Sequence, residues 1–152
     1  MLKIIYGLAS ILTLVILISI ILSTVSCSRK PQLGLSHNRL LPCPSSPNCV
    51  CSEYPDQNGF SQPLRFSGPS DKAWQRAREI ITTMGGSIVE DNYHYLHAVL
   101  TSRFFRFVDD LELRMDDEAK VIHFRSASRI GKSDLGVNRK RVDDLRSLFM
   151  KQ

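Results

Sequence analysis

Hydrophobic residues run without a charge through the first part of the chain. No charged side chain occurs from Ile4 to Ser26, and Ile and Leu dominate from Ile11 to Leu22. A helix of this length reaches roughly 30 Å, enough to cross the hydrocarbon core of a bilayer. Lys3 and the amino terminus favour an orientation with the N-terminus in the cytoplasm. We therefore interpret residues 1–26 as a signal peptide or transmembrane anchor, with a buried core helix as the alternative.

Two later segments repeat their apolar residues at helical spacing. The first follows Gly68-Pro69-Ser70, where Ser70 or Asp71 is the expected N-cap, and ends at Gly85-Gly86. The second begins between Asp134 and Asn138. The apolar faces that predict these helices are Trp74, Ala77, Ile80, Ile81 and Met84 in the first, and Val142, Leu145, Leu148 and Phe149 in the second.

Alternation of apolar and polar residues predicts the strands. They cover residues 60–66, 87–90, 93–102, 104–115 and 121–126. The first contains Pro63, which is tolerated only at the edge of a sheet. With the helices, the order β-α-β-β-β-β-α predicts an α+β domain: an antiparallel sheet of about four or five strands with two helices packed on one face.

Charged residues interrupt these expected strands. His94 and His97 fall on opposite faces, so they cannot bind one metal ion. Asp109 interrupts a face otherwise formed by Leu111 and Leu113, whereas the neighbouring Asp110 belongs to the other face. A buried carboxylate without a partner is strongly destabilising, so Asp109 requires a cation nearby.

Length and charge limit the number of domains and the kind of partner. With 152 residues, the chain divides into residues 1–26, a polar tether at 27–40 and a single domain at 41–152. The formal net charge of +5 is local, because residues 124–141 contain six basic side chains and the single acid Asp134. A nucleic-acid-binding protein would spread Lys and Arg over a whole face, so we expect no nucleic-acid partner.

The end of the apolar segment resembles a lipoprotein processing site. Small or apolar residues, Ser23-Thr24-Val25-Ser26, lead directly to Cys27. In the lipobox of bacterial lipoproteins the leader is cut before such a cysteine, which is then diacylated. We predict lipidation of Cys27, with an uncleaved single-pass anchor as the alternative. Ser28, rather than Asp, is typical of sorting to the outer membrane. Either alternative tethers the domain to the cell membrane or outer membrane, facing the periplasm or the exterior.

The segment around Cys43 and Cys49 is stiff, because three prolines fix φ and remove N–H donors. In an oxidising compartment two cysteines this close usually bridge, so we predict a Cys43–Cys49 disulfide. Zinc bound by these cysteines with Cys51 and His37 is one alternative, although the spacing is not the paired C-x2-C type; a catalytic thiol is another. We expect no metal and no other cofactor.

Most candidate site residues fall in residues 124–141, a strand end, a polar loop and a helix start. Asp109 or Asp110 lies within reach of Arg125 or Arg129, either as an ion pair that fixes strand register or within a pocket for an anionic group. Arginine forks and the free N–H groups of a helix N-terminus suit carboxylate or phosphate. The candidate ligand-binding residues are Asp109, Asp110, Arg125, Ser126, Ser128, Arg129, Ser133, Asp134, Asn138 and Arg139.

The sequence contains residues that could act in catalysis, but they do not form a recognised catalytic motif. Ser126 and Ser128 lack a G-x-S-x-G elbow, and the adjacent Asp109 and Asp110 diverge on a strand. We therefore favour a membrane-tethered binding or interaction module of the cell envelope, with an Arg-rich anion-binding surface, over an enzyme. A hydrolase-like enzyme acting on an anionic substrate and a purely structural role for the arginines are the alternatives. The expected partners are the membrane and a small anionic ligand or an envelope protein.

Three motifs carry a family resemblance. They are Cys43-Pro44 with Pro47-Asn48-Cys49-Val50, the segment 107–112, and Arg125-Ser-Ala-Ser-Arg129 through Asn138-Arg139. From about Leu41 to Leu148 the chain resembles the domain of unknown function 1499 (DUF1499) family. The resemblance implies a small α+β domain, often behind a signal or membrane segment, with no established activity. That family usually has Ser or another small residue at the place of Cys51, so the resemblance implies that Cys51 is an unpaired thiol.

Overall fold

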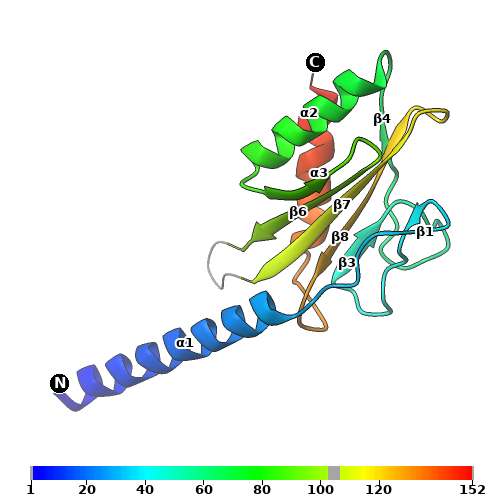
Figure 1. Cartoon of the computed structure of the whole chain (residues 1–152). Helices are drawn as coiled ribbons and strands as arrows, with labels where there is room; N and C mark the ends of the chain where they lie inside the picture. The colour runs from blue at the N-terminus through cyan, green and yellow to red at the C-terminus, as the bar shows by residue number, and fades with distance from the viewer. Residues whose placement is uncertain (1, 103–106, 152) are drawn as a thin grey trace.

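A single long helix precedes the folded domain. The computed structural model of the chain describes residues 2–102 and 107–151. Helix α1 (Leu2–Ser28) projects away from the rest of the molecule (Figure 1). Its segment Tyr6–Ser28 has a mean hydropathy of 2.7, so it is long and apolar enough to cross a membrane. The helix fits the expected signal or membrane anchor.

The domain is built on an antiparallel sheet of six strands. Its main path runs β3-β8-β7-β6-β5, and β4 pairs with the other end of β8. Two further short strands form a separate hairpin before it. The strands are β1 (Leu35–Ser36), β2 (Arg39–Leu40), β3 (Cys49–Cys51), β4 (Leu64–Arg65), β5 (Ser87–Asp91), β6 (Tyr95–Thr101), β7 (Val108–Asp116) and β8 (Val121–Ser128).

Two helices, α2 (Ser70–Thr83) and α3 (Val137–Met150), cover one face of the sheet (Figure 1). Their apolar stripes meet the alternating apolar residues of the central strands. Fully or almost fully buried residues from both layers form the core, among them Trp74, Ile81, Leu111, Phe124 and Leu145. The predicted α+β class, with two helices on one face, is confirmed.

The element boundaries differ from the sequence prediction in three places. The strand expected at 60–66 is reduced to β4, because Pro63 interrupts it and Phe60 makes only a bridge to Cys51. The cap position of α2 is Pro69, and the hydroxyl of Ser70 instead accepts a hydrogen bond from Lys120. The strand expected at 104–115 is described only from Val108, since residues 103–106 lie outside the described residues.

Additional strands arise where the sequence indicates only a turn and a tether. The disulfide segment forms β3, which pairs with the outer edge of β8. Residues 35–40 form the β1-β2 hairpin, and Leu40 is completely buried. The N-terminal part of the chain therefore packs on the domain instead of running free in solvent.

Gly59 occupies a position where a side chain cannot fit. Its φ is 88°, and an added Cβ would lie 2.4 Å from the carbonyl oxygen of Cys49. Gly34 has a φ of 103° but open space around it. We expect Gly59→Ala to lower the free energy of unfolding by more than about 2 kcal/mol, and Gly34→Ala by about 1 kcal/mol, because only the first adds a steric clash to backbone strain.

The measurement is chemical unfolding of the full-length chain in nanodiscs of neutral lipid, followed by near-UV circular dichroism. Equal losses for the two variants would show that the close approach of Gly59 to Cys49 does not constrain the fold.

Candidate functional site

Strand β7 places carboxylates on both faces of the sheet. Asp109 points with Leu111 toward α2 and α3, whereas Asp110 and Glu112 point to the opposite face. All three carboxylates are at most 2% exposed. Two groups of polar residues surround them. The helix-side cluster consists of Asp109, Ser126, Asn138 and Arg141; the outer-face network consists of Glu53, Tyr95, His97, Asp110, Glu112, Arg114, Arg125 and Arg129.

The helix-side cluster holds a buried ion pair between the sheet and α3. Arg141 Nη2 lies 2.6 Å from Asp109 Oδ2, and its Nη1 donates to Ser126 Oγ at 3.1 Å. Ser126 in turn donates to Asn138 Oδ1 at 2.6 Å, an oxygen that also accepts from Arg141. The carboxylate that interrupts the apolar face is therefore paired with a cation, as a buried charge requires.

Asn138 extends this cluster to the start of α3 and to the disulfide segment. Its Nδ2 donates to the carbonyl of Asn48 at 3.1 Å and to Ser128 Oγ at 2.9 Å. Asp134 accepts hydrogen bonds from the backbone N–H groups of Asn138, at 2.7 Å, and of Gly136, at 3.0 Å. Asp134 thus satisfies free donors in the first turn of α3, so the helix N-terminus is already capped.

Asp110 lies at the end of the outer-face network that is nearer to α1, and it accepts hydrogen bonds from two side chains there. Arg129 Nε and Nη2 contact its two oxygens at 2.9 and 2.8 Å, and His97 Nε2 donates to Oδ1 at 2.8 Å. Burial alone would raise the pKa of Asp110, but the hydrogen bonds from His97 and Arg129 outweigh it and hold that pKa below its ordinary value. The same pairing raises the pKa of Arg129. Both groups remain charged.

Glu112 joins the sheet to the segment that follows α1. Its carboxylate accepts hydrogen bonds from Arg125 at 2.7 Å, from the hydroxyl of Tyr95 at 2.9 Å and from the backbone N–H of Gly34 at 2.7 Å. Arg125 also donates to the carbonyl of Gln32 at 3.4 Å. Burial, with Glu112 beside it, raises the pKa of Tyr95, so the hydroxyl stays a donor. Residues expected to be a tether therefore close this face.

Glu53 pairs with two arginines at the other end of the outer-face network. Arg114 Nε lies 2.7 Å from one of its oxygens and Arg39 Nε lies 3.1 Å from the other. Burial opposes ionisation, but Arg114, His123 and Arg39 together hold the pKa of Glu53 below its ordinary value. Burial also lowers the pKa of His123, which favours its neutral form.

The candidate residues are therefore divided between the two faces. The structure joins Asp110 to Arg129, and it joins Ser126, Ser128 and Asp134 through Asn138. Arg125 pairs with Glu112 instead of an aspartate. Arg139 donates to the carbonyl of Phe60, and Ser133 accepts the N–H of Leu135, so these two stand apart from both groups.

Sequence reasoning missed several members of the two groups. They are Glu53, Tyr95, His97, Glu112, Arg114 and Arg141; sequence reasoning also missed Asn48, which contacts the helix-side cluster. Alternation along β7 already placed Glu112 on the face of Asp110, and Arg141 lies one helical turn after Asn138. Those signals were sufficient for two of the residues. The participation of Asn48 and Glu53 depends on a long-range fold of the N-terminal segment that no local pattern indicates.

The predictions for Cys43, Cys49 and Cys51 are confirmed. Cys43 and Cys49 form a disulfide with their Cα atoms 5.6 Å apart, as expected. Cys51 is a free, buried thiol whose pKa is raised by burial, a poor environment for a thiolate nucleophile. Within residues 2–102 and 107–151, no group of three or more His, Cys, Asp or Glu side chains is arranged to hold a metal ion.

The fold defines a small α+β domain with a charge-paired sheet, preceded by an apolar helix. The family comparison agrees with this class. The chain belongs to the family described as protein of unknown function (DUF1499), whose model matches residues 39–149. No curated protein matches the chain.

The Asp109–Arg141 pair can be tested by removing one partner. We expect Arg141→Leu to destabilise the domain by about 3–5 kcal/mol, because it leaves a buried carboxylate without its cation. The double variant Asp109→Asn/Arg141→Leu should recover part of that loss. Lys140→Leu, which removes an exposed i,i+4 pair with Asp144, should cost less than about 1 kcal/mol. Chemical unfolding checks all three, and a loss for Arg141→Leu no larger than for Lys140→Leu would contradict the assignment.

Asp110 gives the domain a specific acid sensitivity. Because its folded pKa lies below the unfolded value of about 3.9, its contribution to stability is present above about pH 4 and is lost as pH falls through the folded pKa. The difference in melting temperature between the wild-type chain and Asp110→Asn should therefore shrink from about pH 6 to about pH 3. Asp56→Asn, at an exposed position, is the control. A difference for Asp110→Asn that is independent of pH would disprove the role.

Proposed function

We propose that the protein is a membrane-anchored binding domain that acts outside the cytoplasm and retains α1 as a transmembrane anchor. Its charged sheet residues hold the domain in one shape and join it to the anchor. The ligand or partner is bound elsewhere on the surface. This proposal keeps the binding-module interpretation of the sequence, but it assigns the arginines around β7 a structural role.

The joint between α1 and β7 is the observation that carries the proposal. Ser26 is completely buried, and its hydroxyl accepts a hydrogen bond from the N–H of Val108 at 2.9 Å and donates to the carbonyl of the same residue at 3.5 Å. The carbonyl of Cys27 accepts from Arg129 at 3.4 Å. Phe107 and four residues of α1 between Val15 and Leu22 line an apolar hollow of about 190 Å³.

These contacts favour a retained helix over lipoprotein processing. Cleavage before Cys27 would remove Ser26, and the N–H of Val108 would lose a buried partner. The charge of Lys3 before the apolar segment supports a cytoplasmic N-terminus, and the Cys43–Cys49 bridge suits the oxidising side of the membrane.

The state of the acidic groups favours binding over hydrolysis. A general acid or nucleophile needs an open position from which it can reach a substrate. Asp109, Asp110 and Glu112 are instead buried, and each accepts short hydrogen bonds from an arginine. Withdrawing an arginine toward a substrate would leave its carboxylate unpaired in a buried site.

The mass of the chain recovered from membranes tests the anchor. We expect residues 1–26 to be present, and Cys27→Ser to change the mass by the substitution alone. A chain that begins at a diacylated Cys27 would overturn the proposal.

A stability measurement on the same preparations tests the joint. Ser26→Ala should lower the free energy of unfolding by about 1–3 kcal/mol, because Val108 loses its partner. Ser28→Ala is the matched control, since its exposed hydroxyl bonds only within α1, to the carbonyl of Thr24. Equal effects of the two variants would mean that the contact between Ser26 and Val108 gives no support for a retained helix.

A further inference from the structure

A groove opens at the end of the domain opposite α1. It lies between the β4–α2 connection and the C-terminal end of α3, and its volume is about 750 Å³. Figure 1 shows that the C-terminus and the top of β4 are at the far end of the domain from α1. Grooves that hold small molecules have volumes of roughly 300–1,000 Å³. None of the candidate ligand-binding residues from the sequence analysis lines this groove.

The groove carries cations that the fold does not neutralise. The side chains of Arg65 and Lys72 are exposed, and the described residues provide neither of them with a hydrogen bond or an ion pair. Arg76 donates one hydrogen bond, to the carbonyl of Leu148 at 3.0 Å. This differs from the arginines around β7, each of which meets a carboxylate.

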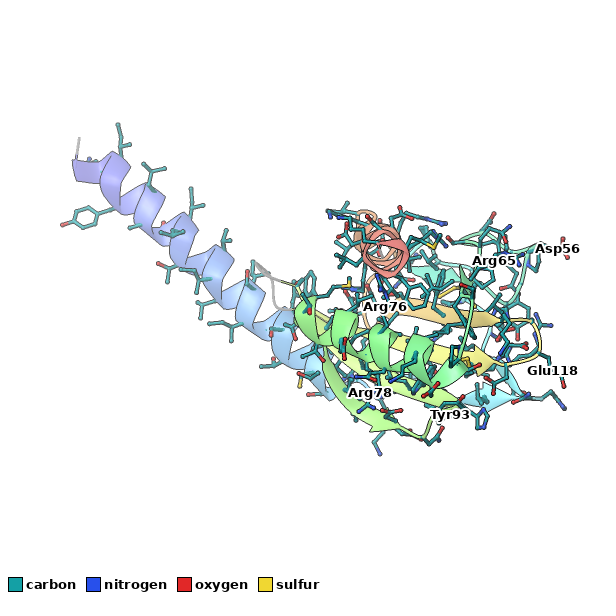
Figure 2. The ribbon with its side chains drawn as sticks, turned by 90° about the horizontal axis from the view of Figure 1, so that it is seen from above. Asp56, Arg65, Arg76, Arg78, Tyr93 and Glu118 are labelled. Atoms are coloured by element: carbon teal, nitrogen blue, oxygen red, sulfur yellow. A yellow bond between two sulfur atoms is a disulfide. The ribbon has the colours of Figure 1, made fainter. Side chains whose placement is uncertain are left out.

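The groove also has one acidic side chain, and only one side of α2 contributes cations to it. Glu79 lines it and accepts a hydrogen bond from Gln75 at 2.9 Å, so three cations face one carboxylate. Figure 2 shows Arg76 on the side of α2 that faces α3, and Arg78 on the other side of the helix. Arg78 pairs with Asp91 at 2.8 Å and does not contribute to the groove. The charge excess is therefore a property of this groove and not of the whole helix.

Aromatic rings lie beside these cations. Phe66 is half-buried and also lines the groove, with the ammonium group of Lys120 5.6 Å from its centroid. Phe149 is 6% exposed, and the guanidinium carbon of Arg76 lies 5.9 Å from the centroid of its ring. A ligand that contacts the cations can therefore place an apolar part against Phe66 and against the small exposed part of Phe149.

We propose that this groove binds an anionic amphiphile, a carboxylate or phosphate group on a short alkyl or acyl chain. Arg65, Lys72 and Arg76 hold the anionic group by charge-assisted hydrogen bonds, and Phe66 and Phe149 contact the chain. The inference rests on the proposed binding function and names its site and ligand class. Charge complementarity selects the anion, and the rings select an amphiphile over a free inorganic ion.

Photolabelling of the full-length chain in phosphatidylcholine nanodiscs tests the proposal. The probe is an alkyl phosphate that carries a diazirine, and mass spectrometry locates the adducts. We expect adducts on residues 64–76 and 147–151. Octyl phosphate or octanoate should protect these segments, whereas inorganic phosphate and octyl glucoside should not.

Two double variants that remove the same amount of charge distinguish binding in the groove from nonspecific electrostatic attraction of the probe. Arg65→Gln/Lys72→Gln should reduce labelling of the groove segments by about tenfold or more, because two charge-assisted contacts are lost. Arg29→Gln/Lys132→Gln, at exposed positions near the α1 end, should leave it unchanged. Unchanged labelling in the first variant, or equal protection by octyl glucoside, would overturn the proposal. Protection by polyglutamate but not by octyl phosphate would overturn it in favour of an acidic protein partner.

The same samples separate this inference from the anchor proposal. A chain that retains residues 1–26 but is not labelled in the groove contradicts the groove alone. A chain cut at Cys27 but labelled in the groove contradicts the retained anchor alone.

Discussion

Buried carboxylates on β7 impose the strongest constraint on this domain. Asp109, Asp110 and Glu112 lie within four successive positions of one strand, yet all are removed from water. An unpaired ion in such a place costs about 3–5 kcal/mol, a large share of the stability of a typical domain. The chain therefore has to bring a cation to each carboxylate. Arg125 comes from β8 and Arg129 directly follows the last residue of that strand, whereas Arg141 comes from α3. The positions of β8 and α3 relative to β7 follow from this requirement.

Pairing the carboxylates of β7 also involves the segment that follows α1. Tyr95, Arg125 and Glu112 would face solvent if the sheet had only its helical layer. The backbone of residues 32–34 closes over them and supplies both a donor, the N–H of Gly34, and an acceptor, the carbonyl of Gln32. A polar face thus becomes an interior surface largely through hydrogen bonds and ion pairs. Because the covering segment is continuous with α1, closing the sheet also fixes where the helix meets the domain.

The core was predictable and the charge pairing was not, for one physical reason. Apolar stripes such as Trp74 and Ile81 depend on the local period of a helix or strand, which any window of the sequence shows. The partner of a charge depends on register between distant segments. In the observed register Glu112 lies opposite Arg125, and Asp110 lies opposite Ala127, so Arg129 reaches it diagonally. A sequence supplies the arginines but not that register, which is why the sequence prediction paired Arg125 with an aspartate instead of Glu112.

This use of charge determines where the molecule is free to recognise something else. Helices cover one face of the sheet and the N-terminal segment covers the other, so the arginines described on β7 and β8, Arg114 and Arg125, are buried and paired with carboxylates. In our proposal, recognition takes place at the perimeter of the sheet, where exposed cations can pair with an anionic group. Arg65 and Arg129 show the contrast: the first is exposed in a groove, and the second is bound by Asp110 on two nitrogens. That groove lies at the end of the domain away from α1, so with α1 as the membrane anchor that we propose, a ligand would reach the groove from the side away from the membrane (Figure 1).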